Sequence, residues 1–354
     1  MKIIQVIDKL AVGGAERVAV DLSVLLSQNK EVSVAFLCLL EPSILDKELL
    51  EANIPVNYLK RQNKYNPFTV YKLYKILNNY DIVHVHSRHV LRYVGLLLFP
   101  MFKRKFKLVF HDHYGQIDTD TSVSKYVKFC IKKSAAYIGV SKSLTTWAVK
   151  NQLNAKVTLL SNIVRLQKEQ ILKTSKGTLV AIGNFRPQKN YEFLCHLLSA
   201  LPEHITLDIY GNSVDNEYYT KIVDLVTELN ITSRVNIIVG ENSPQKLLCN
   251  YKLAVHCAES ETGPLVAIEY LSQELPVIMY QTGEVAETIS AYSSELLMND
   301  FEISNWVSMI ELLLTDNSKR VAFSKLGKKI YEEQYSEENY TQKCLDIYQH
   351  ILNS

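Results

Sequence analysis

The chain has 354 residues, of which 47% are hydrophobic and 21% charged, and its formal net charge is +2. One hydrophobic core rarely serves so many residues, so we expect two domains, and the composition excludes a disordered or fibrous protein. No stretch approaches the roughly 20 apolar residues that span a bilayer.

The charge is divided unevenly along the chain. Residues up to Arg165 include 24 basic and 12 acidic side chains, and the remainder includes 15 basic and 25 acidic ones. A basic half indicates an anionic partner. The sequence lacks the zinc-ligand spacings and aromatic motifs of nucleic-acid-binding modules, so we expect no nucleic acid. A membrane surface or a pyrophosphate-linked acceptor fits better.

Short apolar strands alternate with helical patterns through the first half, which predicts an α/β fold with a mainly parallel, doubly wound sheet. The predicted strands are Ile3–Ile7, Val32–Leu39, Val56–Leu59, Ile82–His86, Lys107–Phe110, Tyr137–Val140 and Val157–Leu160. The helical patterns lie at about 15–28, 43–52, 67–78, 89–99, 122–134 and 142–150.

The first strand meets Asp8 too soon after Met1 for a signal peptide. The six cysteines are scattered without a Cys-x-x-Cys pair, which is typical of small core residues in a reducing compartment. We therefore expect a cytoplasmic protein.

The turn Gly13-Gly14-Ala15-Glu16 follows the first strand and precedes a helix. Glycine lets a ligand approach the backbone, and the N–H groups of a helix start can face that ligand; a tight turn needed only for packing is the alternative. The turn differs from the Gly-x-Gly-x-x-Gly fingerprint of dinucleotide-binding enzymes, so we do not expect an NAD enzyme.

Histidines lie at the ends of two successive predicted strands. His84 and His86 share one face of their strand, and His111 and His113 end the next one. Such a histidine can position a substrate. The alternative is a structural histidine whose hydrogen bonds are all made within the protein. A metal site is a further possibility, but no carboxylate or thiolate is evident to complete it, and Asp118-Thr-Asp120 lies in a polar loop. We therefore predict no metal.

The stretch 88–107 combines apolar and aromatic residues with the basic cluster Lys103-Arg104-Lys105. This composition is typical of a segment that lies on an anionic membrane, and a buried helix followed by a solvated loop is the alternative. Further basic residues favour contact with the inner face of the cell membrane: Lys60, Arg61, Lys64, Lys128, Lys132 and Lys133.

A polar interval divides the chain, and a second strand–helix alternation follows it. We expect domains at 1–166 and 178–335, a linker at 167–177 and a C-terminal helix at 336–354. The strands predicted in the second half are Thr178–Ile182, Thr206–Tyr210, Val235–Val239, Leu253–His256 and Val277–Met279. The last two helical patterns lie at about 318–334 and 337–353.

Arg186 and Lys189 lie on a turn after Gly183 and the first strand of the second half. A guanidinium fork and a lysine charge can hold a diphosphate there; a solvated basic turn is the alternative. Gly211 and Gly283 also follow strands, and each can border a nucleotide or form a plain turn.

Glu261 and Glu269 lie eight residues apart, with the turn-forming pair Gly263-Pro264 and the start of a helical pattern between them. The helix start offers backbone N–H groups to an anion, and a carboxylate further along can bind both hydroxyls of a ribose. Two surface glutamates that flank an ordinary helix start are the alternative.

This region, Cys257–Ile278, resembles the donor-binding signature of retaining glycosyltransferases of the GT-B fold, in the large sequence family numbered four. The usual wording there is Glu-Gly-Phe-Gly, four apolar residues, Glu-Ala and a Gly-Leu-Pro-Val-Ile strand. Here Thr262-Gly263-Pro264 replaces Gly-Phe-Gly. The family's phosphate element has an arginine directly after its glycine, where this chain has Asn184, and Arg186 lies two residues further on.

The resemblance implies two Rossmann-like domains that face a central cleft. The first would bind the acceptor, the second a nucleotide-sugar, and the final helix would cross back to the first domain. Glu269 would hold the ribose, Lys189 and Arg186 the diphosphate, and Glu261 would contact the donor sugar. His113, with the other histidine of that strand end (His111) as the runner-up, would position the reacting centre. The remaining implied donor contacts are Gly14, Gly183, Gly211, Gly263, Pro264, Leu265, Val266 and Gly283.

The implied reaction is a metal-free transfer that retains the anomeric configuration. A UDP-sugar is the preferred donor, and a lipid-linked intermediate of surface polysaccharide synthesis is the preferred acceptor. Two alternatives stay open. One is another enzyme of this architecture, such as a nucleotide-sugar epimerase or a phosphorylase, and the other is a non-catalytic membrane-associated partner with a degenerate donor site.

Overall fold

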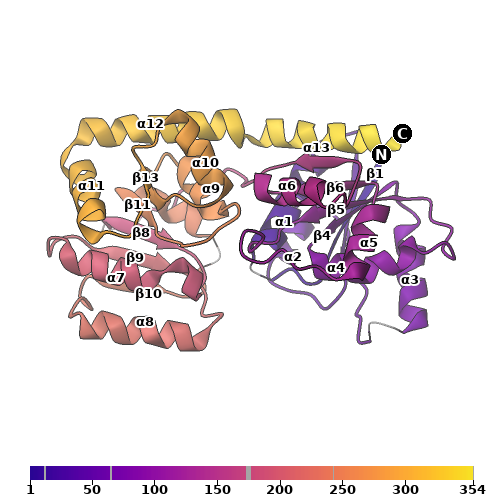
Figure 1. Ribbon diagram of the computed structural model, residues 1–354, viewed down its shortest axis with the longest axis horizontal. Helices are drawn as coiled ribbons and strands as arrows, with labels where there is room; N and C mark the ends of the chain where they lie inside the picture. Colours follow the sequence, from indigo (N-terminus) through magenta and orange to yellow (C-terminus); the bar gives the residue numbers. More distant parts are fainter. Residues whose placement is uncertain (12, 64–65, 173–176, 242, 354) are drawn as a thin grey trace. The chain divides into compact units, whose positions relative to one another are not determined.

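The computed structural model describes residues 1–11, 13–63, 66–172, 177–241 and 243–353. They form two compact units (Figure 1). Unit 1 comprises Met1–Val164 and Glu337–Ser354, and unit 2 comprises Arg165–Ser336. Each unit has its own parallel sheet and hydrophobic core, which confirms the predicted α/β fold class.

The sheet of unit 1 is built from short, buried strands. They are β1 (Lys2–Ile7), β2 (Ser33–Cys38), β3 (Val56–Tyr58), β4 (Ile82–His86), β5 (Lys107–Asp112), β6 (Ala136–Gly139) and β7 (Val157–Leu159). Their order among the described residues is β3-β2-β1-β4-β5-β6-β7, and every neighbouring pair is parallel. Each predicted strand of this half is present, because an apolar run of this length has few alternatives in a doubly wound sheet.

Helices connect these strands. They are α1 (Gly14–Ser27), α2 (Asp46–Glu51), α3 (Pro67–Leu77), α4 (Arg88–Val94) with the 3-10 turn η1 (Gly95–Leu98), α5 (Lys125–Lys133), α6 (Lys142–Lys150) and α13 (Glu337–Leu352). Asn66, Ser124 and Ser141 start three of them by accepting a hydrogen bond from a backbone N–H of the first turn.

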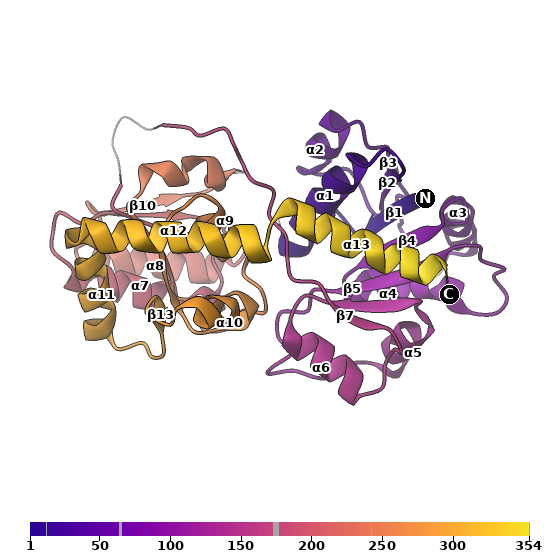
Figure 2. The ribbon, with the colours of Figure 1, turned by 90° about the horizontal axis from the view of Figure 1, so that it is seen from above.

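The last helix of the chain, α13, is part of unit 1 and lies beside α1 (Figure 2). Its apolar stripe is buried: Tyr340, Leu345, Tyr348 and Ile351. Tyr348 reaches the sheet, where its hydroxyl lies 2.5 Å from Nδ1 of His84 on β4. The end of the chain is therefore joined to the sheet by a polar contact as well as by apolar packing.

Unit 2 repeats the parallel arrangement. Its strands are β8 (Leu179–Ile182), β9 (Leu207–Tyr210), β10 (Val235–Ile238), β11 (Leu253–His256), β12 (Val277–Tyr280) and β13 (Leu297–Met298). Its helices are η2 (Pro187–Lys189), α7 (Tyr191–Ala200), α8 (Asn216–Glu228), η3 (Pro244–Asn250), α9 (Leu265–Ser272), α10 (Gly283–Tyr292), α11 (Ile303–Thr315) and α12 (Asn317–Gln334). The described strands follow the order β10-β9-β8-β11-β12-β13. The sequence did not predict β13, because two paired residues are too short for a recognisable pattern.

The stretch 88–107 divides into a buried part and an exposed part. The apolar side chains of α4 and η1 belong to the core of unit 1. Phe99, Met101 and the cluster Lys103-Arg104-Lys105 are exposed. Within the described residues, we find no helix that combines the length and the apolar character needed to cross a membrane.

Both sheets have a point where the strand order reverses, between β1 and β4 in unit 1 and between β8 and β11 in unit 2. Open α/β sheets bind ligands beyond the carboxyl ends of their strands at such points. The loops that leave these strand ends are therefore the first places to examine for a site.

Candidate functional site

Two loops meet at the reversal point of unit 2. The loop after β8 contains Arg186 and Lys189, and the loop after β11 contains Glu261. The backbone N–H of Glu259 donates to the carbonyl of Gln188 (3.0 Å) and joins the two loops. The residues predicted to hold a diphosphate and a sugar therefore lie at the same sheet edge.

Lys189 and Glu261 form an ion pair, with side chains 16% and 20% exposed. Burial alone would raise the pKa of the Glu261 carboxyl, but the charge of Lys189, its hydrogen bond and the charge of Arg186 hold that pKa below its ordinary value. Glu261 is thus ionised at neutral pH. A lysine ammonium has three donors, so Lys189 can keep this partner and still donate to an anion. The sequence predicts separate contacts of these two residues with a donor; in the structure they contact each other.

His256, the last residue of β11, belongs to this group, although no sequence pattern singles it out. Burial, and then the nearby charge of Lys189, lowers the pKa of His256 to about 4. The ring is therefore neutral at pH 7, and its Nε2 has no hydrogen-bond partner among the described residues. Arg186 is exposed, and its charge acts on Glu261. Arg186 thus lies near the ion pair although it is displaced in sequence from the position usual in the family.

The helix α9 starts at the same edge. Pro264 is its N-cap residue, and the first N–H groups of a helix have no partners within it. The N–H of Ile182, at the end of β8, donates to the hydroxyl of Tyr270 (2.9 Å), which fixes α9 to the reversal point. Glu269 is half-buried in the second turn. The other predicted contacts in this segment form the turn and the helix start: Gly263, Leu265 and Val266.

The glycines of this edge are required by close loop packing. Gly283 has φ +77°, and a Cβ there would collide with the carbonyl oxygen of Glu261. A Cβ on Gly211 would collide with the carbonyl oxygen of Gly183. Packing therefore accounts for Gly211 and Gly283, and their contact with a nucleotide stays a prediction.

In unit 1, Gly14 is the exposed first residue of α1. The carboxylate of Glu16 lies so near that a Cβ on Gly13 would collide with it. A carboxylate is favourable at a helix N-terminus. The start of α1 thus has a negative charge of its own, and the contact of Gly14 with a donor stays a prediction.

His113 follows β5 and is half-buried. Burial lowers its pKa to about 3, so the ring is neutral at pH 7. Its Nε2 lies 3.1 Å from Nδ1 of His86. His111 is fully buried within the strand. Of the two histidines at this strand end, His113 is therefore the one that can meet a ligand.

A buried ion pair lies next to His113. Arg88 donates to both carboxylate oxygens of Asp112, at 2.8–3.2 Å. The Tyr137 hydroxyl also donates to Asp112 (3.0 Å), and the guanidinium lies over the rings of Tyr114 (4.1 Å) and Trp147 (4.7 Å). This pair fixes the loops after β4 and β5. The sequence does not reveal this pair, because Arg88 and Asp112 belong to different elements.

The predicted Asp-x-Asp loop is held by its own hydrogen bonds. Asp120 accepts from the Tyr114 hydroxyl (2.7 Å) and from the N–H of Ser122 (2.8 Å), and Asp118 is exposed. These contacts give Asp120 a role in shaping the loop.

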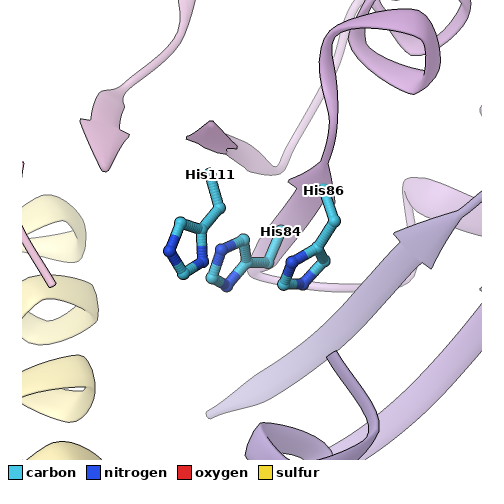
Figure 3. Close-up of side chains that lie close together, drawn as sticks. All are labelled: His84, His86 and His111. Atoms are coloured by element: carbon cyan, nitrogen blue, oxygen red, sulfur yellow. The ribbon is translucent and has the colours of Figure 1, made fainter. Parts of the chain in front are cut away.

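The ligand atoms of His84, His86 and His111 lie within 4.8 Å of one another, and all three side chains are buried (Figure 3). The rings are stacked: the planes of His84 and His86 differ by 16°, and those of His84 and His111 by 25°. An imidazole binds a metal in the plane of its own ring, so stacked rings direct their lone pairs along separate planes. Both nitrogens of His86 also have hydrogen-bond partners. The stacking and the hydrogen bonds of His86 oppose a shared metal, and the absence of a metal stays a prediction.

Two family models match the chain in succession. "Glycosyltransferase Family 4" matches residues 12–168, and "Glycosyl transferases group 1" matches residues 163–330. The two matches together extend through both units.

Similar proteins agree with these matches. N-acetyl-alpha-D-glucosaminyl L-malate synthase of Bacillus anthracis is 23% identical over 289 residues, which cover 77% of this chain and 76% of that protein. Poly(ribitol-phosphate) alpha-N-acetylglucosaminyltransferase of Staphylococcus aureus (strain COL) is 19% identical over 252 residues, or 69% of this chain, and the match spans 50% of that longer protein.

Among solved structures, Anabaena HepE in complex with UDP and glucose is similar, with a TM-score of 0.82. The identity is 16%, and the superposition covers 99% of this chain and 100% of HepE. The similarity supports the fold inferred from the two parallel sheets. Both units and both family matches lead to one conclusion: the chain belongs to the GT-B glycosyltransferases.

Proposed function

We propose that this glycosyltransferase moves a sugar from a UDP-sugar to a lipid-linked glycan intermediate of surface polysaccharide synthesis, with retention of the anomeric configuration. The observation that carries the proposal is the Lys189–Glu261 pair at the reversal point of unit 2. A half-buried cation, a nearby exposed arginine and a helix start together form a site that suits a diphosphate.

In this proposal, the reaction depends on the departure of a nucleoside diphosphate. Lys189 and Arg186 stabilise the charge that develops on the leaving phosphate, with help from the first N–H groups of α9. Glu269 holds the ribose, and Glu261 contacts the donor sugar. The acceptor binds to unit 1, where His113 meets a substrate hydroxyl. The acceptor oxygen forms a bond to the anomeric carbon of the donor sugar from the face that the leaving group departs, while the bond from that carbon to the phosphate oxygen breaks. The hydroxyl proton passes to the departing phosphate, and the configuration is preserved.

No metal is needed in this scheme, because the two cations and the helix start supply the positive charge. Transfer should therefore proceed unchanged in EDTA. Loss of activity in EDTA that manganese restores would contradict this part of the proposal.

The choice of UDP has support from similar proteins. HepE has been solved with UDP and glucose, and the names of the Bacillus and Staphylococcus relatives both contain an N-acetylglucosaminyl group. A UDP-hexose or UDP-N-acetylhexosamine is therefore the first donor to supply.

A lipid-linked acceptor is supported by an exposed surface of unit 1 that we call the basic aromatic patch: Phe68, Tyr71, Lys72, Lys75, Phe99, Met101, Lys103, Arg104 and Lys105. Phe68 and Met101 are 85% and 82% exposed. The Tyr74 hydroxyl donates to the carbonyl of Lys103 (2.9 Å), which joins α3 to the loop after η1. Apolar tips beside lysines suit an anionic membrane.

Arg61, another basic residue considered for this surface, does not contribute a free charge to it. Arg61 is paired with Asp8 (2.9 Å) and its side chain is 8% exposed, so its charge is already partnered. Lys64 lies outside the described residues.

The test is transfer from labelled UDP-sugars to lipid extracts, with the product analysed by NMR. We expect a glycolipid with the α-configuration of the donor. Co-sedimentation of the protein with anionic but not neutral vesicles, lost in a Phe68→Ala/Met101→Ala variant, tests the membrane part separately. Nucleotide-sugar binding without a product on any acceptor would favour the non-catalytic alternative, and an inverted product would refute retention.

A further inference from the structure

A chain of polar side chains passes through the interior of unit 1 and ends at His113. Nε2 of Gln5, on β1, donates to the hydroxyl of Tyr348 on α13 (3.5 Å). Oε1 of Gln5 lies 2.8 Å from Nε2 of His86 on β4, and Nδ1 of His86 lies 3.1 Å from Nε2 of His113. Gln5, His86 and Tyr348 are fully buried. The strand β1 near the start of the sequence and the helix α13 near its end thus contribute to one series of hydrogen bonds, which we call the hydrogen-bonded line.

The Gln5 amide gives this line a direction. Its oxygen faces His86, so Nε2 of His86 must donate the hydrogen. Burial, and then the neighbouring histidines, hold the pKa of His86 well below its ordinary value, so the ring is neutral. A neutral imidazole with a protonated Nε2 accepts at Nδ1. His113 must then donate from its own Nε2, which leaves Nδ1 of His113 as a hydrogen-bond acceptor.

The surroundings favour neutral rings throughout. His84 stacks with His86 on one side and with His111 on the other, and all three rings are buried (Figure 3). A proton on one ring would be repelled by a proton on the next and would lack water. The nearby carboxylate of Asp112 is bonded to Arg88 and Tyr137 instead. Therefore no charged group among these contacts changes which nitrogen of His86 or His113 donates its hydrogen.

We propose that Gln5 and His86 are positioning residues that hold His113 in the tautomer protonated at Nε2, so that its Nδ1 accepts a hydrogen bond from a substrate hydroxyl. Tyr348 of the C-terminal helix orients the Gln5 amide and so takes part in the same function. The proposal rests on the proposed function in one respect, namely that His113 contacts the substrate. The tautomer of His113 follows from the hydrogen bonds of Gln5 and His86 inside unit 1.

The test is ¹⁵N NMR of histidine-labelled full-length protein at pH 7.5, because protonated and unprotonated imidazole nitrogens have distinct shifts. Signals are assigned with single histidine variants, and His196→Gln, on an exposed position of unit 2, is the control. We expect His113 to be protonated at Nε2 in the wild type. Gln5→Leu removes the acceptor for His86 and should give His113 a mixture of tautomers. Tyr348→Phe should give a smaller change in the same direction and serves if Gln5→Leu does not fold.

Kinetics are then measured on the same variants. Gln5→Leu should lower kcat about tenfold, the value of one ordinary hydrogen bond, with KM for the donor nearly unchanged. A His113 protonated at Nδ1 in the wild type, or unchanged by both substitutions, would overturn the proposal. So would a shift of the His84, His86 and His111 signals on addition of zinc, since that would reveal a ligand set.

The two proposals fail in different ways. If the wild type transfers no sugar but the tautomer responds as expected, the proposed function is wrong and the hydrogen-bonded line stands. If the tautomer responds and kcat does not, His113 does not use Nδ1 on a substrate, and the positioning proposal is wrong.

Discussion

The two units have sheets of similar topology but very different side chains at the reversal point. In unit 2, a cation and a carboxylate pair at the end of the strands, with an exposed arginine beside them. In unit 1, the corresponding edge has the neutral imidazole of His113. The Arg88–Asp112 ion pair of this unit joins the loops after β4 and β5 to each other. The same backbone plan thus provides charge in one unit and neutral hydrogen bonding in the other.

This difference indicates how two domains of one fold can supply different kinds of binding group to a reaction. A diphosphate, which we propose that unit 2 binds, requires fixed positive charge, and the carboxylate of Glu261 keeps the charge of Lys189 in place. A sugar or acceptor hydroxyl requires an oriented donor or acceptor, which buried neutral groups supply without the cost of desolvating a charge.

The largest expected effect concerns the buried ion pair of unit 1. Arg88→Ala leaves the Asp112 carboxylate buried without its charge partner, and we expect a loss of about 3–5 kcal/mol in unfolding free energy. Arg92→Ala, on an exposed position of the same helix, is the control and should change stability little. Urea unfolding measures both. Equal stability of the two variants would show that the pair does not hold these loops together.

The next effect concerns the charges of unit 2. Lys189→Ala should lower turnover by about 10²-fold or more, because it removes a group that stabilises the leaving phosphate. Lys252→Ala, an exposed lysine of the same unit, is the control. Glu261→Gln leaves Lys189 in place, so it should retain nucleotide binding. Full activity of the Lys189→Ala enzyme would remove the basis for the phosphate assignment.

A smaller effect concerns the folding stability of the two units, which should depend differently on pH. Burial lowers the pKa values of His84, His86, His111 and His113 in unit 1, and in unit 2 it lowers that of His256. Their unfolded forms take up a proton near pH 6.5 and the folded forms do not, so stability is lost as the pH falls below about 6.5. We expect a loss of up to about 1.4 kcal/mol per pH unit for each ring, and a steeper loss in unit 1.

The two tryptophans make this measurable. Trp147 lies in unit 1 and Trp306 in unit 2, and the chain has no other. Trp306→Phe and Trp147→Phe each leave one fluorescent reporter for urea unfolding at pH 7.5 and 5.5. Equal pH dependence of the two reporters would contradict the contrast between the units.

Much of the fold follows from the sequence, because buried parallel strands are apolar runs whose ends are marked by glycine, proline and polar residues. The Glu261–Glu269 segment was recognisable for a related reason, because both carboxylates and the helix start between them lie within nine consecutive residues. The Arg88–Asp112 pair and the line from Gln5 to His113 were not, because their partners come from separate elements. Gln5 reads as a polar interruption of β1, and only the packing of α13 and β4 around it reveals its partners.

The most direct test of the central claim, that unit 2 holds a nucleoside diphosphate, is a thermal-shift panel with UDP, GDP and ADP. A ligand at 100 times its Kd stabilises the folded protein by about 2.7 kcal/mol, which gives a visible shift. We predict that UDP gives this shift, that Glu269→Ala abolishes it, and that Glu311→Ala, an exposed glutamate of the same unit, preserves it. No shift with any nucleotide, or a UDP shift that Glu269→Ala retains, would contradict the account.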